Sequence, residues 1–393
     1  MTRARGLAVG QAAAALLAGA PAGPALEARD PAGAASAAAQ TSQQYYVYAC
    51  AESEDEVALL RFTTSGSGGT LEVVKRIPVG VMPVEIEGPH GVAVHPDGRT
   101  WYVYISHGSP FGTIHKYATG TDQKLGESPV GLFPASMDIS AATGLLYVVN
   151  FNLYGEMTPS TVSVVDTESM SEVLQVPSGV MPHGSRIDRA GRRHYHVTMM
   201  DDTLREIDTV SLKEVRTLAL SPHAMHAGHA GDADTEEGRA AMREMHARML
   251  QPTWATPPTR DGRLYVMGNN TNEIVEVDVA KWEVARRFTG THTGPYNGDV
   301  TPDGRTLVVT YKRGAAVGIW DLDKGVEAAR IRTTRTVPHG VVISPDGRYA
   351  FVTNEGVGAE PGVVEVYDIQ SRTRVAAADI GKQAGGVAFW KMQ

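Results

Sequence analysis

Short runs of alternating apolar and polar residues, each broken by a glycine turn, recur along most of this chain. The clearest copies join a short strand to a PDGR turn and a second, aromatic and β-branched strand, in Gly91–Ile105, Gly298–Tyr311 and Gly340–Asn354. Less regular copies are MDISAATGLLYVVN from Met137, SRIDRAGRRHYHVT from Ser185 and ATPPTRDGRLYVMG from Ala255. Alternation with period two predicts strands with one side chain face buried and the other polar.

The turns of these units give the repeat its length. Their glycines, a residue type suited to positive φ, are Gly98, Gly144, Gly191, Gly262, Gly304 and Gly347. Successive glycines are 42 to 47 residues apart, except for one step of 71. After each unit come a third strand ending in Asp and a fourth strand, as in NEIVEVDVAKW followed by EVARRFTG. Four short antiparallel strands in one period are typical of a β-propeller blade.

Six such blades fit between Pro89 and Ile380, and the two chain ends supply a seventh. The C-terminal GGVAFWKM provides one inner strand, and the segment from Tyr45 onward provides three more. Joining them closes the ring and removes its open edges. We therefore predict an all-β, seven-bladed β-propeller over residues 45–393, with a composite closing blade and one helical insertion.

The repeat resembles that of the YVTN family of propellers. The motif stands as FVTN at Phe351–Asn354, HVTM at His196–Met199 and VVTY at Val308–Tyr311, after PDGR-type turns. The resemblance covers roughly residues 45–393. It implies the propeller architecture and says almost nothing about chemistry, because one fold can carry many functions.

The N-terminal residues predict export. Arg3 and Arg5 precede an apolar run from Leu7 to Ala20, and small residues follow up to Ala28. This pattern is typical of a secretory signal over residues 1–28, and it is too short to span a membrane. Residues 29–44 are Ala, Gly, Ser, Pro and Gln with few bulky side chains, which predicts a disordered linker. We expect a periplasmic or secreted protein, the alternative being a cytoplasmic one with an Ala-rich leader.

Charge and cysteine content narrow the chemistry. With 36 Lys and Arg against 44 Asp and Glu, the chain carries a formal charge of -8, so we expect no nucleic-acid partner. The single cysteine, Cys50, allows neither an internal disulfide nor a multi-thiolate metal site. No GxSxG, phosphate-binding glycine loop or HExxH motif is present. Any metal would therefore depend on His, Met or carboxylate ligands.

Three histidines share one repeat position at the start of the inner strand, beside the axis. Counting eight residues back from each turn glycine gives His90, Ser136, His183, Trp254, Tyr296 and His339, and Gly385 matches them in the closing blade. His90, His183 and His339 each stand in a Pro-His-Gly triplet. They predict a metal site of three converging imidazoles with an open position. The alternative is a structural role, in which each imidazole hydrogen-bonds the neighbouring backbone.

The long step between turn glycines places an insertion at about residues 221–251, before the fourth blade. It carries His223, His226 and His229, followed by an expected helix from Asp234 to Leu250 that opens with an Asp234–Glu237 capping box. That helix would align Met242, Met245, His246 and Met249 on one face. We expect the insertion to cover the axial opening and to add ligands, and imidazole with thioether favours copper. The alternative is an apolar methionine face that packs on the propeller.

Further candidates lie on the same rim. The substrate candidates are His107, Trp254, Tyr296 and Asn354, the nearby carboxylates are Glu52, Asp201 and Glu355, and a weaker soft-ligand set is Cys50, Met199 and His107. Three functions stay open. The favoured one is a copper-dependent oxidoreductase acting on a small molecule. The others are a metal-assisted lyase or lactonase, and a non-catalytic propeller that presents its rim to a protein or a surface polymer, with the insertion face as the candidate site for a protein partner.

Overall fold

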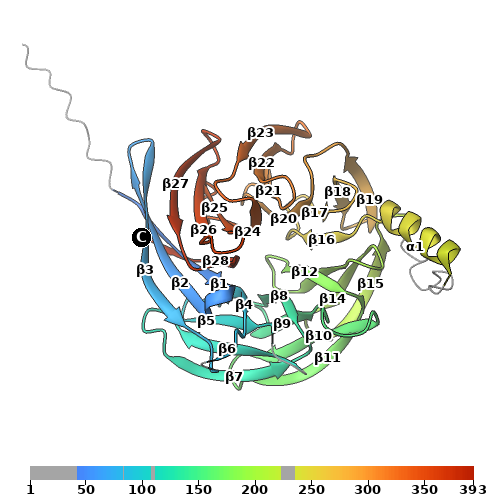
Figure 1. Ribbon diagram of the computed structural model, residues 1–393, viewed down its shortest axis with the longest axis horizontal. Coiled ribbons are helices and arrows are strands. Elements are labelled where there is room, and N and C mark those ends of the chain that lie inside the picture. The colour runs from blue at the N-terminus through green and yellow to red at the C-terminus, as the bar shows by residue number, and fades with distance from the viewer. Residues whose placement is uncertain (1–41, 83, 108–110, 223–234) are drawn as a thin grey trace, which may run out of the picture. The chain divides into compact units, whose positions relative to one another are not determined.

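Seven antiparallel sheets of four strands each surround a central axis (Figure 1). The computed structural model describes residues 42–82, 84–107, 111–222 and 235–393. The predicted export signal, and the predicted linker up to residue 41, lie outside the described residues. The all-β seven-bladed propeller expected from the repeat is confirmed.

Blades 1 to 6 follow one another along the chain, each running from its inner to its outer strand. Blades 1 to 3 are β4 (Pro89–Val94), β5 (Thr100–Ile105), β6 (Gly112–Ala118) and β7 (Lys124–Val130); β8 (Pro134–Ile139), β9 (Leu145–Asn150), β10 (Pro159–Asp166) and β11 (Ser171–Val180); β12 (Pro182–Ile187), β13 (Arg193–Thr198), β14 (Thr203–Asp208) and β15 (Lys213–Ala219). Blades 4 to 6 are β16 (Pro252–Ala255), β17 (Arg263–Gly268), β18 (Glu273–Asp278) and β19 (Glu283–Phe288); β20 (Pro295–Val300), β21 (Thr306–Tyr311), β22 (Ala316–Asp321) and β23 (Val326–Arg332); β24 (Val337–Ile343), β25 (Tyr349–Glu355), β26 (Val363–Asp368) and β27 (Thr373–Asp379).

Blade 7 is built from both ends of the chain. Its strands, from the axis outward, are β28 (Ala384–Met392), β1 (Gln44–Ala51), β2 (Glu56–Ser65) and β3 (Gly68–Pro78). β28 pairs antiparallel with β1 and sets Phe389 opposite Val47, which confirms the predicted closure. The buried rings of Tyr45 and Tyr349, 5.1 Å apart edge to face, pack blade 7 against blade 6.

The glycine turns do what the repeat predicts. The six turn glycines have φ between 69° and 77°, where a side chain would be strained. In the PDGR turns the Asp carboxylate accepts the backbone N–H two residues on, as between Asp303 and Arg305 at 3.0 Å. The DG pair thus reverses the chain between the first and second strands of a blade.

Every inner strand starts with an irregularity that matters for the site. The pairing register between first and second strand shifts directly after the entry residue, which is proline in blades 1 to 6 and Ala384 in blade 7. Such bulges bend a strand and re-aim its side chains. The bulge residue of each blade is therefore free to point at the axis.

The insertion forms the α-helix α1 (Glu236–Arg248). Its N-cap is Thr235, whose side chain accepts a hydrogen bond from the Gly238 N–H at 2.9 Å. The sequence predicted a capping box that begins at Asp234, but the N-cap is Thr235. Asp234 itself lies outside the described residues. Among the described residues no helix is long and apolar enough to cross a membrane.

The expected position of this helix is wrong. Figure 1 shows α1 at the outer circumference, beside the outer strands β15 and β19, and not over the axis. Its C-terminal end is anchored there because the Asn270 side chain donates to the carbonyls of His246 and Met249, at 2.9 and 2.8 Å. Met249 and Leu250, which follow the helix, are buried, and Leu250 packs in the core between blades 3 and 4.

Candidate functional site

The bulge residues of the seven blades form a ring around the axis. They are His90, Ala135, His183, Thr253, Tyr296, His339 and Gly385. This corrects two of the positions derived from the repeat, since Ala135 and Thr253 stand where Ser136 and Trp254 were expected. The turns of blades 2 and 4 are one residue longer than the others, so counting eight residues back from their glycines stops one residue short of the bulge.

Tyr296 lies between two of the predicted histidines. Its hydroxyl oxygen is 3.3 Å from Nε2 of His183 and 3.2 Å from Nε2 of His339. The His90 ring meets the His339 ring edge to face, with centroids 5.1 Å apart. The three histidines therefore do come together, as the repeat predicts, and a tyrosine from a fourth blade joins them.

The outward nitrogens of these rings are held by acceptors. Nδ1 of His183 donates to the Thr253 carbonyl at 2.7 Å, and Nδ1 of His90 donates to Glu52 at 2.7 Å. Nδ1 of His339 lies near the Gly385 carbonyl but has no hydrogen bond of good geometry. With the protons on Nδ1, the Nε2 atoms of His90 and His183 carry lone pairs.

Glu52 connects the axial cluster to a histidine that is partly exposed to solvent. It follows β1 in a short 3-10 turn (Glu52–Glu54) and is 2% exposed. One carboxylate oxygen binds His90, and the other accepts from Nε2 of the half-exposed His107 at 2.8 Å. Burial alone would raise its pKa, but the two histidines outweigh burial and lower the pKa of Glu52 to about 2. The hydrogen bond to Glu52 in turn raises the pKa of His107.

Burial keeps the central imidazoles neutral. Desolvation lowers the pKa of His183 to about 3, against the opposing Thr253 hydrogen bond. Desolvation, with the positive charge of Lys312 next in size, holds the pKa of His339 well below its ordinary value. Both rings therefore resist protonation, and as neutral imidazoles they can accept a hydrogen bond or bind a metal ion without first losing a proton.

Lys312 is a site residue that the sequence reasoning missed. Its Nζ lies 4.4 Å from the centre of the Tyr296 ring and 3.0 Å from a carboxylate oxygen of Glu355. Burial would lower the pKa of this lysine, but the charge interactions with Tyr296 and Glu355 raise it. The sequence did carry a signal for it: Lys312, Glu355 and Glu52 each directly follow the second-strand residue that pairs with the entry residue of the inner strand.

The axial channel is closed one layer below the ring. Trp254 lies there, at a position where four other blades have glycine, and Arg186 stacks on it at 4.9 Å. A Cβ on Gly184 would collide with the Trp254 ring. A cavity of only about 40 Å³ remains in this layer. Trp254 is therefore the floor of the site and not a rim residue.

Other predicted residues have structural roles or lie elsewhere. The Asn354 side chain is buried and donates to Glu365 within its own blade, at 3.1 Å. Cys50 is fully buried, and burial raises its pKa. His246 belongs to the peripheral helix α1. The other proposed lid ligands, His223, His226 and His229, lie outside the described residues.

The three imidazoles alone are not arranged as a metal site. Within residues 42–82, 84–107, 111–222 and 235–393, no group of three or more His, Cys, Asp or Glu side chains is placed to hold an ion. Two of the three imidazoles face a tyrosine hydroxyl instead of one another. Any metal site at the axis therefore needs this hydroxyl or some rearrangement of the rings.

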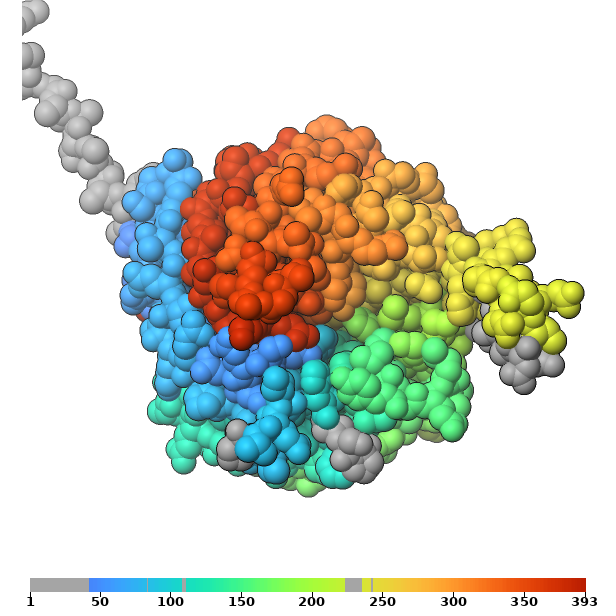
Figure 2. All heavy atoms as spheres, in the orientation of Figure 1, coloured from blue at the N-terminus to red at the C-terminus, as the bar shows by residue number. Residues whose placement is uncertain are grey.

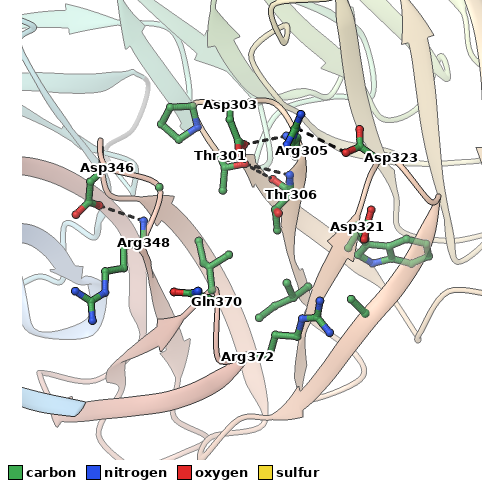
Figure 3. A pocket seen from close by; sticks show the side chains of 16 residues that line it. Thr301, Asp303, Arg305, Thr306, Asp321, Asp323, Asp346, Arg348, Gln370 and Arg372 are labelled. Carbon is green, nitrogen blue, oxygen red and sulfur yellow. Dashed lines mark hydrogen bonds and ion pairs between the residues drawn. The ribbon is translucent and has the colours of Figure 1, made fainter. Parts of the chain in front are cut away.

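A wider groove of about 660 Å³ lies between blades 5 and 6 (Figure 3). It is lined by the PDGR turns, which follow the inner strands, whereas the histidines stand at the start of those strands. Its polar side chains serve the glycine turns: Asp303 and Asp346 bind the backbone of their own turns, and Arg305 pairs with Asp323 at 3.7 Å. These groups are solvated and already paired. The axial cluster, with buried titratable groups from five blades, is the better candidate for a functional site.

The fold and site define a seven-bladed β-propeller with a polar cluster of His, Tyr, Lys and Glu on its axis. No protein-family model matches the chain. No curated protein matches it either. Among solved structures, a chain of hydrazine synthase from Kuenenia stuttgartiensis is similar, with a TM-score of 0.57 and 19% identity over 74% of this chain and 81% of that one. At this identity the similarity concerns the propeller fold.

Proposed function

We propose that this protein is an exported propeller of the YVTN type that binds a transition metal at its axial histidines and acts there on a small molecule as a metal-dependent oxidoreductase. The observation that carries the proposal is the orientation of the rings. Glu52 and the Thr253 carbonyl accept hydrogen bonds from Nδ1 of His90 and His183, so both Nε2 atoms carry lone pairs, and Nε2 of His183 faces the Tyr296 hydroxyl on the axis. Metal-binding histidines in proteins have this same arrangement of an outer carboxylate or carbonyl.

We favour copper as the metal, although the structure removes one of the arguments that the sequence gave for it. The methionines of α1 are at the circumference, so thioether ligands no longer enter the argument. Imidazole donors suit copper, zinc, iron and nickel, and copper heads the affinity order of divalent ions. A bound copper ion would supply electron transfer, while the residues around it bind, orient and exclude water.

The rim around the histidines suits a small organic substrate. Phe151 lies edge to face with His183, with centroids 5.0 Å apart, and Phe133 stacks along His107 at 5.7 Å. These rings form an apolar wall above a closed floor. His107 and Glu52 connect this wall to the axis through two hydrogen bonds, which gives a path for a proton between the site and solvent.

A metal-assisted lyase is the second candidate, and Lys312 favours it. Its ammonium group lies against the Tyr296 ring and next to Glu355. A lysine and a tyrosine beside a polarising ion can give and take the proton of a lyase reaction. This candidate shares the site with the first and differs in the metal it needs.

Metal analysis of the purified full chain, followed by calorimetric titration of Cu²⁺ and Zn²⁺ into chelator-treated protein, tests the proposal. We expect one ion per chain, and His183→Ala should abolish most of the binding while His95→Ala, in a glycine turn, leaves it intact. A coloured copper or iron protein supports the oxidoreductase, and a colourless divalent ion supports the lyase. A chain that binds neither ion overturns the metal proposal and leaves a non-catalytic binding propeller.

A further inference from the structure

Tyr296 is the only ring residue of the axial cluster, among the described residues, that touches two histidines from other blades. It stands in the bulge of β20, while His183 comes from β12 and His339 from β24. The hydroxyl is buried together with both Nε2 atoms. The sequence predicted Tyr296 as a substrate-binding residue of the rim, but its hydroxyl lies inside the cluster, between the two histidines.

Tyr296, His183 and His339 together do not have enough protons to give every buried nitrogen of this cluster a hydrogen bond. A phenol has one proton and can donate it to one of the two Nε2 atoms. His183 can accept there only, because its Nδ1 must donate to the Thr253 carbonyl. If His339 carries its proton on Nε2, the lone pair of its Nδ1 is buried without a donor among the described residues. If the proton is on Nδ1, both Nε2 atoms must accept from the single hydroxyl proton, and one of them is left without a donor. Each assignment leaves a buried imidazole nitrogen unsatisfied, which folded proteins normally avoid.

A cation between the three atoms removes this conflict. Metal–nitrogen bonds of about 2.0–2.1 Å at tetrahedral angles put neighbouring ligand atoms about 3.3–3.4 Å apart. The two Oη to Nε2 separations, 3.3 and 3.2 Å, are close to that edge and longer than the usual O–H to N hydrogen bond. An ion on the inner side of this hydroxyl could therefore take Oη and both Nε2 atoms as ligands once the two imidazoles turn toward it.

Lys312 suits an anionic tyrosine in this place. Burial raises the pKa of Tyr296, and the Lys312 charge opposes that effect. Glu355 pairs with Lys312 and lies 3.9 Å from Nε2 of His339. The lysine would offset the negative charge of a phenolate, and the glutamate would offset the lysine, so the added ion would not face an unbalanced positive charge.

We propose that Tyr296 is itself a metal ligand, giving its hydroxyl oxygen as a phenolate beside Nε2 of His183 and Nε2 of His339, with the Glu52-oriented His90 next to them. The inference rests on the proposed metal-binding function and identifies the ligand set. When the ion binds, the oxygen–metal bond replaces the oxygen–hydrogen bond and the hydroxyl proton leaves to solvent. No change of oxidation state is needed in this step.

Zinc titration of the full chain and of Tyr296→Phe tests the inference, because zinc adds no colour of its own. We expect the wild type to develop the ultraviolet difference spectrum of a tyrosinate, saturating at one ion per chain. Tyr296→Phe should lose this signal and at least about 100-fold in affinity, since removing even a residue that only orients a ligand costs 10–100-fold. The phenylalanine keeps the ring, so the variant is expected to fold.

Tyr104→Phe is the matched control. Its ring lies 6.1 Å from that of His90, but its hydroxyl donates to the Ala135 carbonyl at 2.6 Å. This variant should keep both the tyrosinate signal and the affinity. If the wild type binds zinc without a tyrosinate signal, or if Tyr296→Phe binds as tightly as the wild type, the ligand role of Tyr296 is overturned and the metal proposal stands. A wild type that binds no ion overturns both.

Discussion

Two groups of buried histidines in this molecule differ in what surrounds them. His183 and His339, on the axis, have outer nitrogens directed at backbone carbonyls and inner nitrogens directed at one hydroxyl. His194 and His196 are equally buried, but both come from β13 of blade 3 and pack against blade 2, where His194 stacks on Tyr147 at 5.1 Å. Among the residues that the structure describes, neither nitrogen of His194 has a hydrogen-bond partner, and His196 bonds only the Ser178 hydroxyl, at 2.8 Å.

This difference shows what marks a site in a repeat protein. Burial lowers the pKa of His183 and of His194 alike, to about 3 in both cases. A lowered pKa therefore does not separate the groups. The separating feature is convergence: the axial rings come from different blades and direct one nitrogen each at a common point, whereas the pair in β13 serves as core packing.

The largest expected effect is on metal affinity. His183→Ala or His339→Ala should weaken Cu²⁺ binding at least about 100-fold, or about 2.7 kcal/mol, because each removes a direct ligand. His194→Leu should bind copper like the wild type, within about twofold. Calorimetric titration of the three variants checks the comparison. Equal losses in all three would show that the axial rings act only through the stability of the fold.

The acid sensitivity of the fold should be shared by both groups. In the unfolded chain a histidine takes up a proton below its ordinary pKa of about 6.5, whereas buried His194 in the folded chain stays neutral down to about pH 3. Between these two pKa values the unfolding free energy therefore falls by about 1.4 kcal/mol for each pH unit and each such histidine. His194→Leu should therefore gain about 2 kcal/mol on the wild type between pH 7.5 and pH 5, in urea unfolding with chelator present. At pH 7.5 it should not destabilise, because it removes two unpartnered nitrogens. An unchanged pH slope would contradict burial as the cause.

A smaller effect is expected from the group that orients His90. Glu52→Gln keeps the shape of the side chain but removes the charge that fixes both His90 and His107, so copper affinity should fall about tenfold. The comparison variant is His107→Ala, which removes the solvent-side partner and leaves the bond to His90. We expect it to lose less than Glu52→Gln in the same titration. The reverse order would place the important contact at His107 and not at the axis.

The smallest effect is expected from the insertion. His246→Ala should change copper affinity by less than about twofold, because α1 lies at the circumference of the ring (Figure 2). Leu250→Ala should leave the metal site intact and lower stability by about 2–5 kcal/mol, since it empties a buried position. Thermal unfolding and copper titration of both variants separate these roles. A strong loss of copper binding in His246→Ala would mean that the helix reaches the axis in solution.

The repeat pattern was enough to predict the architecture. Strand alternation, the glycine turns and the split seventh blade repeat the same local chemistry in each period, and local chemistry is what a sequence pattern records. For the same reason the pattern found His90, His183 and His339, which share a Pro-His-Gly triplet, and placed them on one axis. It went wrong by one residue at Ala135 and Thr253, where a longer turn breaks the count.

The tertiary structure alone decided which groups touch. The bulge aims Tyr296 between His183 and His339, the second-strand ends bring Glu52 and Lys312 to the same axis, and Trp254 becomes the floor. It also placed α1 outside the ring, although its sequence suggested a lid. Each of these contacts joins residues from different blades, or from an insertion and a blade. Their distances depend on how the blades twist and pack around the axis, which no periodicity within a single blade encodes.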